Sequence, residues 1–248
     1  MLKAYDEYQD TNIRWNNSTP KHWQVKRSKN IFQNKKELNS NHQSNNVLSL
    51  TLRGVINNDI DNPIGLSPKD YATYQLFKKN DLVFKLIDLE NYKTSRVGLV
   101  HEDGIMSSAY IRFSAISQLS INYFYYQYYD LYLRGIYNDL GNGVRSTLSC
   151  RDLLDLQIVI PTINEQYQIV RYLDAKVSKI NRLISAKKKE IEMLTEYKTR
   201  LISDVVTGKV DVRGIHVEDV PEAELIEEFD EEIVDEFDDE TSEEENIE

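Results

Sequence analysis

Residues 164–205 read NEQYQIVRYLDAKVSKINRLISAKKKEIEMLTEYKTRLISDV, and neither proline nor glycine interrupts them. Apolar side chains recur along this stretch at alternating intervals of three and four residues, which is typical of a coiled-coil seam rather than of an ordinary core helix. The seam consists of Val170, Leu173, Val177, Ile180, Ile184, Ile191, Leu194, Leu201 and Val205. Only Lys187 and Lys198 interrupt it. The pattern therefore predicts one long helix, which we call the rod.

The rod requires a partner helix. At about 1.5 Å per residue it spans roughly 60 Å, which is more than a domain of this size can cover. The rest of the chain contains no second long helix with a matching seam. We therefore expect the seam to pair with another copy of this chain or with another protein. A rod packed along its own domain is the alternative.

The residues before the rod have the patterns of short strands. Trp23 and Val25 alternate with polar residues, and residues 81–86, DLVFKL, are typical of a buried strand that follows a turn. Similar runs occur at residues 47–52, 96–101, 110–113 and 156–160. Residues 119–137 are crowded with tyrosine and favour a helix, while residues 1–20 have the composition of an extended arm. Many short strands with few long helices predict an α+β fold built on small mixed sheets.

The sequence thus predicts three parts: a head at residues 1–160, the rod at 161–208 and an acidic tail at 209–248. Residues 211–248 carry a net charge of −18, whereas residues 1–210 carry +7. Such a charged, low-complexity tail is typical of disorder. Ile226, Phe229, Ile233 and Phe237 recur in it at helical spacing, so a short acidic helix docked on a basic surface is the alternative.

The location of the protein is predicted from what the sequence lacks. Its one cysteine, Cys150, excludes an internal disulfide and suits a reducing compartment. The polar N-terminus does not resemble a signal peptide, and no apolar run has the length of a membrane span. We therefore expect a cytoplasmic protein.

No motif predicts catalysis by this chain alone. Neither a phosphate-binding glycine loop nor a paired-histidine zinc motif occurs, and Cys150 is expected to be a core residue rather than a nucleophile. Asp88, Glu90 and Lys93 form a loose nuclease-like set, and residues 139–143 contain a glycine turn. Sets this loose occur by chance. We expect no catalytic residue, no metal site and no cofactor bound by this chain.

Nucleic-acid binding is better supported by the distribution of basic residues. Arginine and lysine side chains at predicted strand ends and loops can hold phosphates, and the neighbouring Asn and Gln can contact base edges. The basic residues are Arg53, Lys85, Arg96, Arg112 and Arg145. The tyrosines of residues 119–137 could stack on bases, but aromatic residues at helical spacing are more often packing residues, and we expect them in the core.

Several motifs together resemble the specificity subunits of type I restriction–modification systems. They are residues 5–8 (YDEY), 13–15 (IRW), 20–27 (PKHWQVKR), 161–170 (PTINEQYQIV), 196–203 (EYKTRLIS) and 206–213 (VTGKVDVR), with weaker matches at 106–110 and 143–146. The chain lacks the usual glycine before Pro20, and the acidic tail is foreign to the family pattern.

The resemblance implies a target recognition domain, residues 1–160, that reads one half-site of double-stranded DNA. It adds Ser146 to the expected DNA-binding residues. It also implies a half-size specificity subunit, because one head precedes one rod. Expected partners are methyltransferase subunits, a restriction–translocase subunit, and a second copy or another half-subunit. S-adenosylmethionine, ATP and Mg would be used by those partner subunits. The alternative functions are a coiled-coil adaptor or decoy with a degenerate head, and an autonomous nuclease.

Overall fold

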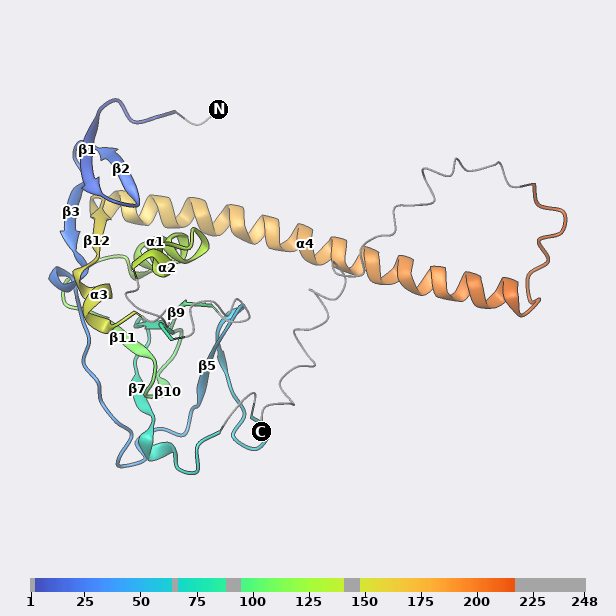
Figure 1. Ribbon diagram of the computed structural model, residues 1–248, viewed down its shortest axis with the longest axis horizontal. Coiled ribbons are helices and arrows are strands. Elements are labelled where there is room, and N and C mark those ends of the chain that lie inside the picture. Colours follow the sequence, from blue (N-terminus) through green and yellow to red (C-terminus); the bar gives the residue numbers. More distant parts are fainter. Residues whose placement is uncertain (1–2, 64–66, 88–94, 141–147, 217–248) are drawn as a thin grey trace. The chain divides into compact units, whose positions relative to one another are not determined.

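The computed structural model describes residues 3–63, 67–87, 95–140 and 148–216 (Figure 1). Its elements in chain order are β1 (Tyr8–Ile13), β2 (Asn16–Pro20), β3 (Gln24–Arg27), η1 (Ser28–Asn30), β4 (Phe32–Gln33), β5 (Leu48–Thr51), β6 (Gly54–Asn57), η2 (Tyr71–Thr73), β7 (Gln75–Phe77), β8 (Leu82–Phe84), β9 (Val97–Leu99), β10 (Gly104–Met106), β11 (Ile111–Ala115), α1 (Ile121–Leu133), α2 (Ile136–Leu140), α3 (Cys150–Asp155), β12 (Gln157–Ile160) and α4 (Ile163–Val206). The predicted α+β fold with small sheets and one long helix is confirmed.

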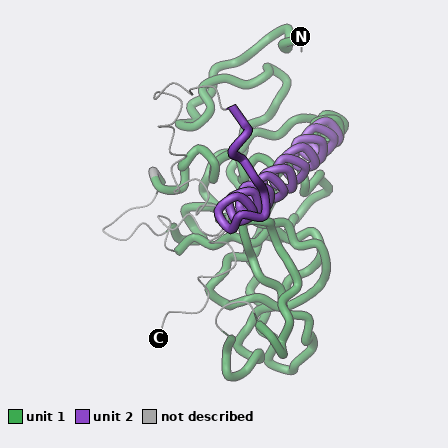
Figure 2. The backbone as a smooth tube through the Cα atoms, turned by 90° about the vertical axis from the view of Figure 1, so that its right-hand side faces the viewer, with its two compact units in different colours: residues 1–170 green, residues 171–248 purple. Residues whose placement is uncertain are grey.

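The chain divides into two compact units, residues 1–170 and 171–248, which Figure 2 colours separately. Unit 1 contains every named strand, the short helices and the first two turns of α4. Unit 2 contains the rest of α4. The predicted end of the head, residue 160, coincides with the last residue of β12.

The centre of unit 1 is a four-stranded antiparallel sheet with the strand order β4-β11-β8-β9. All three residues of β8 are buried, so the predicted buried strand at residues 81–86 is confirmed in its central part. The turn before it requires a left-handed backbone, since Asn80 has a φ of 70°. Phe32, Phe84 and Phe113 pack together beneath α1, with ring centroids 5.0 to 5.6 Å apart for the two contacts of Phe113.

Helix α1 covers this core with its tyrosine-rich face. Tyr128 is fully buried, and its hydroxyl donates to Ser28 Oγ at 2.7 Å. Burial raises the pKa of the Tyr128 phenol far above its usual range. Tyr123, Phe124 and Tyr137 are buried in the same cluster, and the four remaining tyrosines of α1 are half-buried at its edge. The prediction that this stretch is a packing element is confirmed.

The N-terminal residues differ from the predicted extended arm. Residues 8–20 form the antiparallel hairpin β1–β2, which two apolar side chains anchor. Ile13 and Trp15 are buried, and Trp15 Nε1 donates to the carbonyl of Gln157 at 3.1 Å. The arm prediction was wrong because the anchoring contacts lie more than a hundred residues away in the sequence. The antiparallel pair β3–β12 brings the same two regions of the chain together.

A second apolar cluster lies where the hairpin β5–β6 packs on the sheet. Leu48, Leu50, Phe77, Val83, Val100 and Met106 are its buried members. Gly98 allows this close approach, since a Cβ atom there would lie 2.5 Å from Leu50 Cδ1 and 2.7 Å from Val55 Cγ2. The hairpin is therefore held tightly by its two strands, while its turn extends beyond them.

The predicted rod is confirmed as α4, a continuous helix of 44 residues. Its first turn is capped reciprocally, because Thr162 Oγ1 accepts from the Glu165 backbone N–H while the Glu165 carboxylate accepts from the Thr162 N–H. Gly208 follows the last turn with a φ of +76°, as a glycine helix stop requires. Among the described residues, no helix combines the length and the hydropathy that crossing a lipid bilayer requires.

Candidate nucleic-acid interface

The turn between β5 and β6 presents Arg53 to solvent. Thr51 pairs with Gly54 across the hairpin, and Gly54 has a φ of +99°, which favours glycine. Thr51 Oγ1 donates to the Gly54 carbonyl at 3.0 Å and accepts from the Arg53 N–H at 3.1 Å. These bonds give the turn a defined backbone, and both of its central residues, Leu52 and Arg53, are exposed.

The direction of the hairpin brings Arg53 to the same end of the head as Lys85 and Arg96. Gly98 lies under the middle of the hairpin. The far end of β6 lies near the chain two residues beyond the end of β9, because His101 Nε2 lies 3.1 Å from Asn57 Oδ1. The turn therefore points toward the start of β9. Lys85 lies beside this start, since its N–H donates to the Arg96 carbonyl at 3.1 Å. Figure 1 shows β5 rising toward β9.

The three basic residues at this end differ in exposure. Arg53 is exposed, Lys85 is half-buried, and Arg96 is 2 % exposed, with Nη1 donating to the Ile87 carbonyl at 3.2 Å. Burial raises the pKa of Tyr132 on α1, and the positive charge of Arg96 offsets part of this rise. Arg96 is thus buried below the surface, while Arg53 and Lys85 keep exposed area that a ligand can contact. We call these three residues the basic end.

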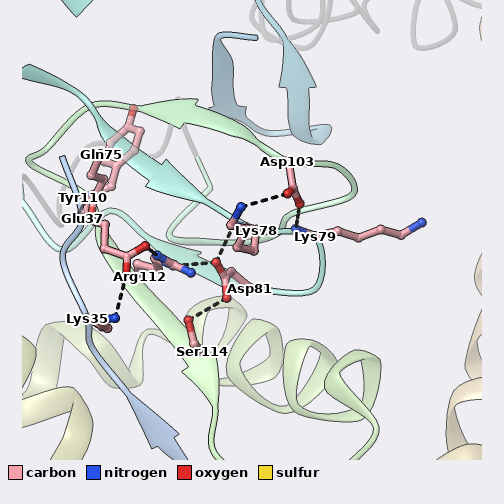
Figure 3. Close-up of polar contacts among 10 residues, drawn as sticks. All are labelled: Lys35, Glu37, Gln75, Lys78, Lys79, Asp81, Asp103, Tyr110, Arg112 and Ser114. Atoms are coloured by element: carbon pink, nitrogen blue, oxygen red, sulfur yellow. Dashed lines mark hydrogen bonds and ion pairs between the residues drawn. The ribbon is translucent and has the colours of Figure 1, made fainter. Parts of the chain in front are cut away.

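Arg112 lies elsewhere, in a buried polar cluster (Figure 3). Its side chain is 7 % exposed, and Nε donates to Asp81 Oδ2 at 2.5 Å. Asp81 also accepts from Ser114 Oγ and from the Lys78 N–H, both at 2.7 Å. Glu37 lies 3.5 Å from Nη1 of the same arginine. Arg112 was expected at a strand end, but β11 continues to Ala115, and the pleat turns Arg112 and Ser114 toward Asp81 together.

Some predicted residues lie outside the part of the chain that the structure describes. These are Arg145 and Ser146 of the expected DNA-binding set, Asp88, Glu90 and Lys93 of the nuclease-like set, the glycine turn at 141–143, and the four apolar residues of the acidic tail.

The opposite end of the hairpin carries amide groups that the sequence analysis did not single out. Asn57 Nδ2 donates to Asn46 Oδ1 at 3.1 Å and to Glu102 Oε1 at 2.7 Å. His101 Nε2 lies 3.1 Å from the same Glu102 oxygen. Both N–H groups of the Asn57 amide and its oxygen are engaged in this network, so the network stabilises this end of the hairpin. Only the hairpin register brings Asn46 and Asn57 together, so composition alone could not identify the pair.

Cys150 lies half-buried at the start of α3, and its Sγ accepts from Asn34 Nδ2 at 2.9 Å. Burial raises the pKa of the Cys150 thiol, with the Asn34 hydrogen bond acting in the opposite direction. A raised pKa reduces the thiolate that nucleophilic chemistry needs. The environment of this thiol is that of a packing residue.

Within unit 2, the seam of α4 is an exposed apolar surface. Val177 is 37 % exposed, Ile184 49 % and Leu194 60 %, values far above those of core residues. Ile180, Ile191 and Leu201 are exposed as well, and Leu173 and Val205 are half-buried. Val170, the first seam residue, belongs to unit 1 and packs in its core. A contiguous apolar surface of this kind marks a site of protein association.

Comparisons with known proteins agree on one family. Residues 20–193 match the family model described as the type I restriction modification DNA specificity domain. The fold is similar to a chain from a structure titled "Structural basis underlying complex assembly and conformational transition of the type I R-M system", with a TM-score of 0.53 and 12 % identity. It is also similar to the HsdS subunit from Thermoanaerobacter tengcongensis, with a TM-score of 0.50 and 14 % identity.

Each of these likenesses covers 82 % of this chain and 52 % of the other. The chain therefore spans about half the length of the solved structures it matches. No curated protein matches it.

Proposed function

Because the chain belongs to the family of type I restriction modification DNA specificity domains, we propose that it is the DNA-recognising specificity subunit of a type I restriction–modification complex. The observation that carries this proposal is the extent of the family match, residues 20–193, which includes most of the head and more than half of the rod. In this proposal the chain is not itself an enzyme. Methyltransferase and restriction–translocase subunits supply the chemistry and use S-adenosylmethionine, ATP and Mg.

Within the head, the basic end is the proposed contact to double-stranded DNA. Arg53 stands on a turn with a fixed backbone, as a side chain that positions a phosphate or a base edge requires. Lys85 lies beside Arg96, which is buried below the surface.

The proposed partner of the rod is a second copy or another half-subunit. In a parallel pair in register, Lys187 would face Lys187 and Lys198 would face Lys198, which places like charges in the seam. In an antiparallel pair centred near residue 189, Lys187 faces Ile191 and Lys198 faces Ile180. The antiparallel arrangement avoids both repulsions, so we favour it for two copies of this chain.

Methylome sequencing of host DNA, with and without this gene and with the methyltransferase partner supplied, tests the function. We expect a methylated motif that depends on the gene. In purified protein, Arg53→Ala and Lys85→Ala should each weaken DNA binding and each reduce the slope of log K against log salt by about 1.

Two outcomes would contradict the proposal. Weak binding that does not change with salt, and no gene-dependent motif, would indicate the adaptor with a degenerate head. Metal-dependent cleavage of DNA by the purified chain alone would indicate a nuclease.

A further inference from the structure

The seam of the rod carries two positive charges among its exposed apolar residues. Lys187 and Lys198 are exposed, and between them lie Ile191 and Leu194, which are 59 % and 60 % exposed. Lys187 Nζ donates to Glu190 Oε2 at 2.7 Å, yet the lysine side chain remains 74 % exposed. A segment that covers this stretch of the seam must therefore offer apolar side chains together with carboxylates.

A second rod meets these two lysines poorly. All residues of the seam other than the lysines are apolar, so the seam of a second copy has no carboxylate to place opposite them. Lysine faces lysine in a parallel pair and isoleucine in an antiparallel pair, and neither arrangement supplies a counter-charge from the facing seam. The stretch from Lys187 to Lys198 therefore suits a segment of opposite charge better than a copy of itself.

The acidic tail contains a segment with both properties, at residues 226–237, which lie outside the described part of the chain. In a helix, Ile226, Phe229, Ile233 and Phe237 would fall within an arc of about 80° and form one apolar face. Seven of these twelve residues are Asp or Glu, and none is Lys or Arg. Like charges this dense oppose an isolated helix, so the segment needs a basic surface on which to fold.

The segment at 226–237, which we call the acidic segment, matches the seam in length and in charge. The stretch from 187 to 198 also contains twelve residues, and each would span about 17 Å as a helix. Residues 171–206 of the rod hold nine Lys or Arg against five Asp or Glu, a net charge of +4. Apolar faces of equal length and opposite charges thus identify the same partner.

The acidic segment can reach this part of the rod. After the rod the chain stays at its last turn, because the Val210 N–H donates to the Asp204 carbonyl at 3.0 Å and Lys209 Nζ lies 3.1 Å from Asp204 Oδ1. The sixteen residues from Val210 to Ile226 can span up to about 50 Å. Lys187 lies only about 25 Å from Asp204 along the helix axis.

We propose that the acidic segment docks as a helix on the seam between Lys187 and Lys198 of the same chain, and that it thereby competes with a second rod. The contact lies within unit 2. Docking within one chain is favoured because a short tether gives an effective concentration in about the millimolar range. The docking rests on α4 and the tail alone, whereas its effect on pairing rests on the proposed pairing of rods.

Photo-cross-linking tests the contact directly. Benzoylphenylalanine replaces Phe229 in the full chain, and a mixture of isotopically light and heavy protein is irradiated at high dilution. Mass spectrometry then identifies the linked peptides. We expect links to peptides from residues 184–201 that carry the same isotope as the tail. Links to the head alone, links only between light and heavy chains, or no links to the rod would each overturn the inference.

Charge reversal in the seam tests the role of the two lysines. Lys187→Glu with Lys198→Glu should abolish most of the links, because the acidic segment would then face carboxylates. The matched control is Lys179→Glu with Lys189→Glu, which makes the same change in charge away from the seam and should retain them. Equal losses in both variants would overturn the docking site, because the tail would then respond only to the net charge of the rod.

The strength of pairing provides a second measurement, by analytical ultracentrifugation. Truncation after Arg213 should lower the dissociation constant of the paired rods by about tenfold or more, because every chain then has a free seam. The combination of Phe229→Ser, Ile233→Ser and Phe237→Ser keeps every charge of the tail and should strengthen pairing to the same extent.

The triple variant separates docking from simple repulsion between two acidic tails. If it pairs as weakly as the wild type while the truncated chain pairs tightly, the inference is overturned, because truncation would then act only by removing that repulsion. If none of these proteins pairs, the proposed pairing of rods fails, and the cross-links alone decide whether the acidic segment docks on the seam.

Discussion

Arg112 and Asp81 form an ion pair inside the head, with Nε and Oδ2 2.5 Å apart and both side chains at most 7 % exposed. Asp81 also holds the turn before β8, through the Lys78 N–H, and binds Ser114 on β11. The pair therefore connects a turn to the central sheet at a position where both side chains are largely buried.

Replacing Arg112 alone should destabilise the protein. Arg112→Leu leaves the Asp81 carboxylate buried without its cation, and the free energy of unfolding should fall by about 3–5 kcal/mol. Urea denaturation measures it. The double variant Arg112→Leu/Asp81→Leu should recover only the part of the loss that comes from the unpaired charge, because it also removes the acceptor of the Lys78 N–H and of Ser114 Oγ. Arg53→Ala, at an exposed turn, should change stability by less than about 0.5 kcal/mol. An Arg112 variant of wild-type stability that no longer binds DNA would instead support its role as a DNA contact.

Stability should depend on pH through Glu165. Burial alone would raise the pKa of this carboxyl, but hydrogen bonds from Thr162, His22 and Trp23 outweigh burial and lower the pKa from 4.5 to about 2. A lowered pKa in the folded state stabilises the fold above pH 4.5, and this contribution is lost as the pH falls toward 2.

Glu165→Gln imitates the protonated carboxyl. The variant should therefore be less stable than the wild type by about 1–3 kcal/mol at neutral pH. This difference should shrink between pH 4.5 and 2, as measured by denaturation at a series of pH values. A difference that stays constant across that range would show that the charge of Glu165 contributes nothing.

Charge in the seam should separate the rods. Ile180→Asp with Ile184→Asp puts two carboxylates into an apolar contact and should convert the paired protein into monomers, as measured by analytical ultracentrifugation. Ser178→Asp with Ser185→Asp adds the same charge away from the seam and should leave the pairing intact. If the wild-type protein is monomeric at micromolar concentration and binds no half-subunit, the prediction that the seam pairs two rods is wrong.

Removing the acidic tail should strengthen non-specific DNA binding. Truncation after Arg213 removes the whole net charge of −18 carried by residues 211–248, because the retained Asp211 and Arg213 cancel, and this charge repels phosphates or occupies the basic end. The gain should be largest at low salt and small at high salt, because salt screens the repulsion. Titration of random-sequence DNA at two salt concentrations measures it. Equal affinities of both proteins at low salt would leave the tail as a solvated segment only.

Two identical heads should read an interrupted palindrome, because two-fold symmetry in the protein is matched by two-fold symmetry in the DNA. Deleting one heptad, residues 187–193, keeps the seam in register and shortens the rod by roughly 10 Å. The half-sites should stay the same while the gap shrinks by about three base pairs. Methylome mapping measures both the half-site bases and the gap length. A non-palindromic motif that depends on this chain alone would point to a heterodimer.

The parts of the fold that could be predicted are those with a local signal. The rod displays a heptad period, the strand around Val83 is an apolar run that follows a turn, and the tyrosine-rich helix is a long stretch without proline. The hairpin β1–β2 could not be predicted, because Trp15 is anchored by a carbonyl that lies 142 residues further along the chain.

The candidate site shows the same division. A sequence reveals an arginine but not its partner. Arg112 and Arg53 were therefore both predicted to bind DNA, whereas in the fold Arg112 forms a buried ion pair with Asp81. The start of α4 had one readable signal, Thr162 followed three residues later by Glu165, which is the pattern of a capping box. His22 and Trp23 are brought to that carboxylate only by the fold.

Gly98 has a consequence for how this head can change. Leu50 and Val55, one in each strand of the hairpin, pack closely against Gly98. Leu52 and Arg53, in the turn, are exposed and take no part in this contact. The residues of the turn can therefore be substituted while the packing of Leu50 and Val55 against Gly98 is unchanged. If the turn contacts DNA as proposed, a change of target requires the exchange of a few exposed residues, and the cost in stability is small because no core contact is rebuilt.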